Sequence, residues 1–362
     1  MIDIKKHIEN IKPSENSGSR ASNRFDFQKN WSICKILELH RKPDDYLLTL
    51  EYYDDVIVFD SSTDPKKISF YQIKTNEKKN WTINSLITRK KGKNGDLNSI
   101  LGKLYNHLEN FEDTVKSLNF VTNNKIKGTL KNNKDCEDTN EFCCADLNKE
   151  TLNKIISELK KEHSLNSLKE FENIMFFKLG ELNIDKHTEL TKAALADFLD
   201  KYLPGVRYQI APLYKSIFDE IKMKSNYEKT ISTFEELRVK KSISRNNFNS
   251  YLDELQKVEN FKEKRSSIEN RLNSESVAFD EIKSFIKHSS QYEIRRMGYN
   301  DKGLKEVEKM IDKFITENRI DLKSGLFNCM EHIFFNLQGT IVKNPTIENE
   351  FVKAIILHRL YE

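Results

Sequence analysis

The sequence contains few of the residues that bend or crosslink a polypeptide chain. It has 6 Pro and 11 Gly in 362 residues, and so little of both disfavours a turn-rich all-β fold and favours helices. Its 5 cysteines are Cys34, Cys136, Cys143, Cys144 and Cys329, an odd number without a C-x-x-C pair. That pattern argues against a disulfide framework and against a structural zinc site.

Long apolar runs and a strong net charge are also missing. No apolar run is long enough to span a membrane, and Met1–Lys6 lacks the apolar segment of a secretory signal. We therefore expect a cytoplasmic protein without a membrane partner. The formal net charge of +4 is not that of a general nucleic-acid binder. Contact with DNA would need a local basic patch, and Arg89, Lys90, Lys91 and Lys93 are the candidates, although such a run is also typical of a solvated loop.

The first two thirds of the chain show an α/β pattern. The chain is long enough for two domains, and an apolar stripe predicts a helix that begins near Asn23. The further elements that we predict in this part are strands at 46–52, 55–60 and 68–75, a helix at 96–111 and a strand at 118–122. This order indicates a small mixed sheet flanked by helices.

The last third of the chain looks helical. No Pro occurs between Pro212 and Pro345, strand-like runs nearly vanish, and apolar residues recur at helical spacing. We predict a flexible segment at 1–22, an α/β domain at 23–228 and an all-helical region at 229–362 that binds a partner or oligomerises.

Polar residues on two neighbouring strands form the most informative group. Side chains alternate along a strand, so Gln72 and Lys74 project from one face about 7 Å apart. Asp55 begins the preceding predicted strand and can lie opposite them. Glu51, at the end of the first predicted strand, can reach the same edge.

These residue types fit a metal-dependent phosphodiesterase. Mg²⁺ prefers oxygen ligands, and we predict Asp55, Gln72 and Glu51 as its ligands, with Mn²⁺ as a substitute. The metal would polarise the phosphate and activate a bound water, and the Lys74 ammonium would orient that water and offset the charge that develops. The predicted catalytic set is therefore Asp55, Gln72, Lys74 and Glu51. The same spacing also occurs in solvated hairpins, but Phe70 and Ile73 indicate a packed strand here.

Asp55, a gap of sixteen residues and Gln72-Ile73-Lys74 resemble the signature of the restriction-endonuclease-like superfamily. That signature is an Asp, a gap, an acidic residue, any residue and Lys. The departure is Gln72 in place of an acid, which some branches of the superfamily share. It lowers the negative charge of the site and should weaken metal binding.

A wider set of segments resembles one family. Over residues 18–225 the chain is similar to the double-stranded-DNA endonuclease domain of bacterial anti-phage effectors, the nuclease type of CBASS and Lamassu systems. The segments that carry this resemblance are Arg24–Gln28, Glu51–Val56, Phe70–Thr75, Lys103-Leu104 and Phe120–Asn123. The resemblance implies that Asp55, Gln72 and Lys74 are catalytic. Asp54 and Gln28 are family-like positions to which it gives no role.

The helical C-terminal region is too short and too helical to resemble the SAVED sensor of CBASS effectors. This favours a Lamassu nuclease subunit, whose C-terminal region docks on an SMC-like ATPase with its accessory subunit. We therefore expect a nuclease of double-stranded DNA that stays inactive until a partner releases or oligomerises it. Cleavage of both DNA strands needs two active sites, so we expect the active form of the protein to be a homo-oligomer.

Two alternatives remain open from the sequence. One is a non-catalytic DNA-binding or scaffold subunit with a degenerate nuclease fold, which Gln72 keeps possible. The other is the nuclease subunit of a HerA-type ATPase complex. An unrelated enzyme class has little support, and His107, beside Leu104 and Leu108 on a predicted helix, is interpreted as core packing.

Overall fold

The computed structural model describes residues 17–77, 79–92, 95–206, 208–259, 261–296, 301–341 and 348–361. The chain divides into two compact units. The first unit comprises Met1–Leu195 and Ile221–Arg245, and the second comprises Ala196–Glu220 and Asn246–Glu362.

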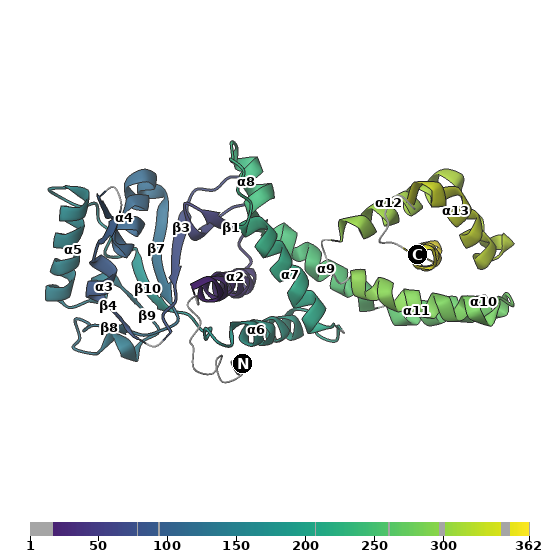
Figure 1. Ribbon diagram of the computed structural model, residues 1–362, viewed down its shortest axis with the longest axis horizontal. Helices are drawn as coiled ribbons and strands as arrows, with labels where there is room; N and C mark the ends of the chain where they lie inside the picture. Colours follow the sequence, from purple (N-terminus) through teal and green to yellow (C-terminus); the bar gives the residue numbers. More distant parts are fainter. Residues whose placement is uncertain are drawn as a thin grey trace, which may run out of the picture. The chain divides into compact units, whose positions relative to one another are not determined.

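A mixed sheet forms the centre of the first unit (Figure 1). In the described part of the chain this sheet has seven strands in the order β11-β1-β2-β3-β7-β10-β9. Strands β3, β7 and β10 run parallel to one another, and the other neighbours are antiparallel. The strands are β1 Leu47–Tyr52, β2 Asp54–Phe59, β3 Ile68–Lys74, β7 Val115–Thr122, β9 Glu141–Cys143, β10 Met175–Leu179 and β11 Ser242–Ser244.

Two small two-stranded sheets accompany the large one. One is the parallel pair β4 and β8, and the other is the antiparallel pair β5 and β6. Their bounds are β4 Trp81–Thr82, β5 Lys90–Gly92, β6 Gly95–Leu97 and β8 Ile126–Lys127.

Helices cover both faces of the large sheet (Figure 1). Helix α2, Ser17–His40, lies on one side, and α3, Ile83–Ile87, α4, Ile100–Phe111, and α5, Lys149–His163, lie on the other. Helix α8, Phe234–Lys241, packs beside β1. This arrangement buries strand β3 along nearly its whole length, as expected for a strand covered on both faces.

Helix α4 shows how the sequence sets an element boundary. The Ser99 side chain accepts a hydrogen bond from the Gly102 N–H at 2.9 Å and so caps the first turn. Leu101, Leu104 and Leu108 then face the core on one side of the helix. Its opposite side is left free to carry polar residues.

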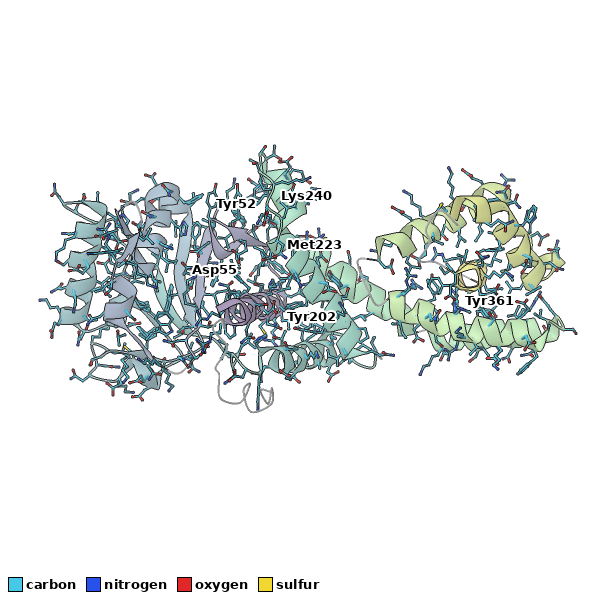
Figure 2. All side chains as sticks on the ribbon, viewed as in Figure 1. Tyr52, Asp55, Tyr202, Met223, Lys240 and Tyr361 are labelled. Carbon is cyan, nitrogen blue, oxygen red and sulfur yellow. The ribbon has the colours of Figure 1, made fainter. Side chains whose placement is uncertain are left out.

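The second unit is built from helices around its own core. Figure 2 draws the side chains of both units and labels Asp55 in the first and Tyr361 in the second. The core of the second unit includes Phe261, Phe285, Tyr292, Ile333 and Ile355, each 5% exposed or less. The remaining helices of the chain are α6 His187–Tyr202, α7 Ile210–Ser225, α9 Arg245–Glu259, α10 Phe261–Ser274, α11 Phe279–Arg296, α12 Lys302–Asn318, α13 Leu326–Ile341 and α14 Asn349–Leu360.

The predicted fold class is confirmed: a mixed sheet flanked by helices is followed by a helical C-terminal region. No helix in the described ranges combines the length and the apolarity that a membrane crossing requires. The boundary that we predicted between residues 228 and 229 stays a prediction. Strand β11 nevertheless lies beyond it and pairs with β1.

Several element limits differ from the sequence prediction. Helix α2 begins at Ser17 rather than near Asn23, because its exposed first turns need no apolar stripe and contain no Pro. The helix predicted from residue 96 begins at Ile100, because Ser99 caps it and residues 95–97 pair in the β5–β6 hairpin. Strand β11 was missed because three residues are too short for an alternating pattern to be visible.

Candidate active site

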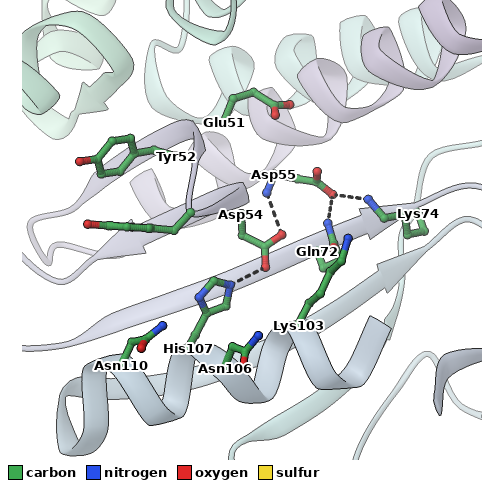
Figure 3. A pocket seen from close by; sticks show the side chains of 11 residues that line it. Glu51, Tyr52, Asp54, Asp55, Gln72, Lys74, Lys103, Asn106, His107 and Asn110 are labelled. Carbon is green, nitrogen blue, oxygen red and sulfur yellow. Dashed lines mark hydrogen bonds and ion pairs between the residues drawn. The ribbon is translucent and has the colours of Figure 1, made fainter. Parts of the chain in front are cut away.

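A polar cleft of about 560 Å³ opens at the β1–β2 hairpin of the first unit (Figure 3). Strands β1, β2 and β3 supply one wall, and helix α4 supplies the other. The lining residues are Glu51, Tyr52, Tyr53, Asp54, Asp55, Gln72, Lys74, Lys103, Asn106, His107 and Asn110.

Asp55 is the centre of the hydrogen-bonded group in this cleft. Its Oδ2 accepts from Gln72 Nε2 at 2.6 Å, from the Ile73 backbone N–H at 2.7 Å and from Lys74 Nζ at 3.1 Å. The Asp55 side chain is 13% exposed and that of Lys74 is 36% exposed. The structure therefore brings together three of the four predicted catalytic residues, and one carboxylate joins them.

Glu51 lies at the rim of the same cleft. It lines the cleft with Asp55, but it stands apart from the hydrogen-bonded group in Figure 3. Glu51 is an exposed residue, but partial loss of contact with water raises its pKa to about 7, and the Asp55 carboxylate adds to this shift. The predicted role of Glu51 as a metal ligand stays a prediction.

The backbone of the hairpin is unusual next to Asp55. Glu51 has φ 48° and Tyr53 has φ 63°, both in the left-handed region. Residues other than glycine adopt this region at a cost of about 1–3 kcal/mol each, and such residues cluster at functional sites. The two left-handed residues lie on either side of Tyr52, which pairs with Asp54 across the hairpin.

Asp54 holds the backbone of its neighbour in place. Its Oδ1 accepts from the Asp55 N–H at 2.8 Å, and its Oδ2 lies 3.1 Å from His107 Nε2, which donates to it. The His107 ring stacks on Phe70 with ring centres 4.1 Å apart. The interpretation of His107 as core packing was therefore incomplete, because its ring packs against the core while its Nε2 supports a cleft carboxylate.

Gln28 also acts on the backbone of the site. From α2 its Nε2 donates to the carbonyl of Ile73 at 3.2 Å, between Gln72 and Lys74. Its Oε1 is buried and has no hydrogen-bond partner within the described residues. Gln28 thus contacts the strand that carries Gln72 and Lys74 from the face opposite α4.

Burial dominates the electrostatics of Asp55. Loss of contact with water raises the pKa of this carboxyl above its usual value, whereas Lys74 and the hydrogen bonds from Ile73 and Gln72 oppose the rise. A buried carboxylate with a raised pKa, in a cleft and beside a lysine, is typical of functional sites.

The sequence patterns predicted no role in the site for the polar face of α4, although Lys103 lies in one of the segments that resemble the family. Lys103, Asn106, His107 and Asn110 follow helical spacing, and Figure 3 shows them pointing toward the strands. Lys103, Asn106 and Asn110 are not part of the hydrogen-bonded group around Asp55, and their side chains can donate hydrogen bonds to an anion in the cleft. In sequence, these residues form the polar side of a helix whose apolar stripe includes Leu104 and Leu108. Such a polar side is typical of any helix that faces solvent.

The donor set fits a hard divalent cation only when the substrate completes it. In the described parts of the chain, no three His, Cys, Asp or Glu residues lie close enough to hold a metal. Asp55 offers a carboxylate and Gln72 an amide oxygen, which are hard ligands. Water and phosphate oxygens would have to supply the rest, as is usual for Mg²⁺ at phosphoryl groups.

The predicted DNA-binding patch lies outside the cleft lining. Arg89 Nη2 donates to the Asp96 carbonyl at 3.2 Å, which ties its side chain to the β5–β6 hairpin. Lys90 and Lys91 are exposed on β5, and Lys93 lies outside the described residues. Contact of this hairpin with DNA stays a prediction.

Comparison with known proteins identifies two similarities. Residues 16–225, more than half of the chain, match the family described as Cap4, dsDNA endonuclease domain. The chain is also 27% identical over 255 residues to the Lamassu protein LmuA of Bacillus cereus (strain VD014). That alignment covers 69% of this chain and 68% of the relative.

Proposed function

Because the chain belongs to the family of the Cap4 dsDNA endonuclease domain, we propose that it is a metal-dependent nuclease that cuts double-stranded DNA in anti-phage defence. The similarity to a Lamassu protein supports the place in defence. The observation that carries the proposal of an active site is the Asp55 carboxylate bound to Gln72, Ile73 and Lys74 in one polar cleft.

Asp55 and Gln72 would hold the divalent metal, Mg²⁺ or Mn²⁺, with Glu51 as a further ligand at the rim. The bound cation supplies Lewis-acid polarisation of the phosphate and lowers the pKa of a water on it. Gln72 brings no charge, so the site depends on phosphate and water for its remaining ligands.

Lys74 acts on the charge of the reacting phosphate. Its Nζ lies 3.1 Å from the Asp55 carboxylate, and both residues line the cleft. There it can orient the attacking water and offset the negative charge that grows on the phosphate oxygens. No nucleophilic side chain is needed.

Helix α4 would hold the DNA backbone opposite these strands. Lys103 can bind a phosphate through charge, and Asn106 and Asn110 can donate hydrogen bonds from their amides. Lys90 and Lys91 on the β5–β6 hairpin would contact phosphates farther along the duplex. Since each cleft cuts one strand, cleavage of both strands requires two copies of the chain.

Control by a partner is the second part of the proposal. The second unit has its own core and exposes the aromatic side chains of Phe279 at 77% and Phe335 at 73%. We assign this helical unit to docking on an SMC-like ATPase with its accessory subunit, which would keep the nuclease inactive until release or oligomerisation. A HerA-type ATPase is the alternative partner.

Plasmid cleavage by the purified protein tests the proposal. Wild type, Lys74→Ala and the control Lys66→Ala are compared with Mg²⁺, Mn²⁺ or EDTA, alone and with the candidate ATPase and ATP. Lys66 is a matched control because it lies in the β2–β3 turn, 73% exposed and paired with Asp64.

The expected result is cleavage by wild type and Lys66→Ala that EDTA and Lys74→Ala abolish. Cleavage that survives Lys74→Ala would reject the site. DNA binding without cleavage under all conditions, with the ATPase included, would favour the non-catalytic DNA-binding subunit.

A further inference from the structure

A short segment outside the family match completes the candidate active site. The match ends at residue 225, whereas β11, Ser242–Ser244, adds an edge strand to β1 with Thr49 opposite Ser242 and Leu47 opposite Ser244. The hydroxyls of Thr49 and Ser242 lie 2.6 Å apart. The segment Lys241–Arg245 therefore belongs to the nuclease unit although it is far from β1 in sequence.

Lys241 connects this segment to the β1–β2 hairpin. Its Nζ donates to the backbone carbonyl of Glu51 at 2.9 Å, across 190 residues of sequence. Glu51 is one of the two left-handed residues of the hairpin. Its carbonyl begins the peptide that leads to Tyr52, which pairs with Asp54.

The burial of Lys241 makes this contact informative. Lys241 is 5% exposed, and a buried ammonium costs free energy unless it is well paired. A Met side chain of similar length would fill the same space without a charge. The Lys241 Nζ donates to the Glu51 carbonyl, which a Met side chain cannot do.

Arg245 anchors the other end of the segment. Its Nε donates to the carbonyl of Asp44 at 2.7 Å and its Nη2 to the carbonyl of Leu39 at 3.1 Å. Its guanidinium also lies over the Tyr46 ring, 5.3 Å from the ring centre. Arg245 thus fixes the segment to residues that precede β1, and Lys241 fixes it to Glu51 near the end of β1.

We propose that Lys241 is a positioning residue for the nuclease reaction. It holds the left-handed Glu51 peptide, so that the hairpin presents Asp55 to Gln72 and Lys74. This inference rests on the proposed function, since it concerns the geometry of that same site. The chain passes into the second unit again at Asn246, directly after the segment that positions the hairpin.

The test compares Lys241→Met, Lys241→Arg and Lys240→Met in the full-length protein with its metal, and with the ATPase partner if cleavage needs it. Lys240 is the neighbouring residue on α8 and is exposed (Figure 2), which makes it a matched control. The measurements are kcat and KM for DNA cleavage, the melting temperature, and hydrogen exchange of the amides of residues 50–56.

Lys241→Met should lower kcat by about ten- to hundredfold with KM for DNA unchanged, as for residues that orient a site through a neighbour. Exchange in residues 50–56 should become faster, Lys241→Arg should recover most of kcat, and Lys240→Met should match wild type. Faster exchange without any cleavage by wild type would support the positioning and reject the proposed function instead.

Two results would overturn the inference while the nuclease stands. One is a Lys241→Met variant with wild-type kcat and wild-type exchange. The other is a loss of kcat that follows only a lower melting temperature and that Lys241→Arg does not recover, because that pattern describes a general structural role.

Discussion

Replacing Asp55 by Asn should separate the stability of the protein from its activity. Burial raises the pKa of Asp55, so the folded protein disfavours the ionised carboxylate relative to water. For an acid whose folded pKa lies above its unfolded value, this cost is fully present above the folded pKa and disappears in acid, below the unfolded pKa. Asn removes the charge and with it the cost.

The size of the effect follows from opposing contributions. Taking one ion out of water costs several kcal/mol, whereas each hydrogen bond to a charged group returns about 1.5–3 kcal/mol. Asn keeps an oxygen that can accept from the Ile73 N–H but loses the attraction to Lys74. We expect a net change of about 1 kcal/mol or less, which is about 2–4 °C in melting temperature for a unit of this size.

Activity should respond far more strongly. Asn is a weak ligand for a hard cation, and it offers no charge to hold the Lys74 ammonium. We expect cleavage to fall about a thousandfold or more, which corresponds to about 4 kcal/mol of transition-state stabilisation. Stabilisation of the folded protein by added Mg²⁺ should vanish with it.

Thermal unfolding and plasmid cleavage, each with and without Mg²⁺, measure both effects in the same preparations. Asp64→Asn is the control, because Asp64 is 77% exposed in the β2–β3 turn. A melting temperature lowered by about 10 °C or more would show that the Asp55 charge stabilises the fold. Cleavage near the wild-type rate would show that Asp55 is not part of the active site, and either result would refute the reasoning.

Two further predictions concern histidines. His107→Phe keeps the stacking on Phe70 but leaves Asp54 without its donor, so kcat should fall about tenfold with little change in KM; a raised KM with unchanged kcat would contradict this support role. Burial lowers the pKa of His358, in the second unit, to about 3. Because the unfolded chain binds this proton more tightly, the second unit should lose about 1.4 kcal/mol per pH unit below pH 6.5. His358→Phe should remove this slope in far-UV circular dichroism melts between pH 7 and 5, and an unchanged slope would assign it to other groups.

The sequence predicted the centre of the candidate site because that centre is local. Asp55 and the pair Gln72 and Lys74 lie on adjacent strands joined by a short turn, and strand alternation places Gln72 and Lys74 on one face. Their predicted proximity agrees with the hydrogen bonds to Asp55. The catalytic roles themselves stay predictions.

The parts that the sequence missed depend on contacts across the fold. His107 lies beside Leu104 and Leu108 in sequence, so its pattern predicts packing, and only the approach of α4 to β2 gives its Nε2 an acceptor in Asp54. Gln28 likewise gains a role only because α2 passes beneath the carbonyl of Ile73.

The sequence by itself determined the fold class, the helical C-terminal region and the residues of the Asp55 group, because periodicity and short-range pairing set these features. Only the tertiary structure decided which distant residues support that group. Lys241 lies 190 residues from Glu51, at the end of α8 and directly before a strand of three residues whose pattern is too short to predict. Such a contact depends on how β11 joins the edge of the sheet. The pattern of residues along the chain does not show which residues far apart in sequence become neighbours there.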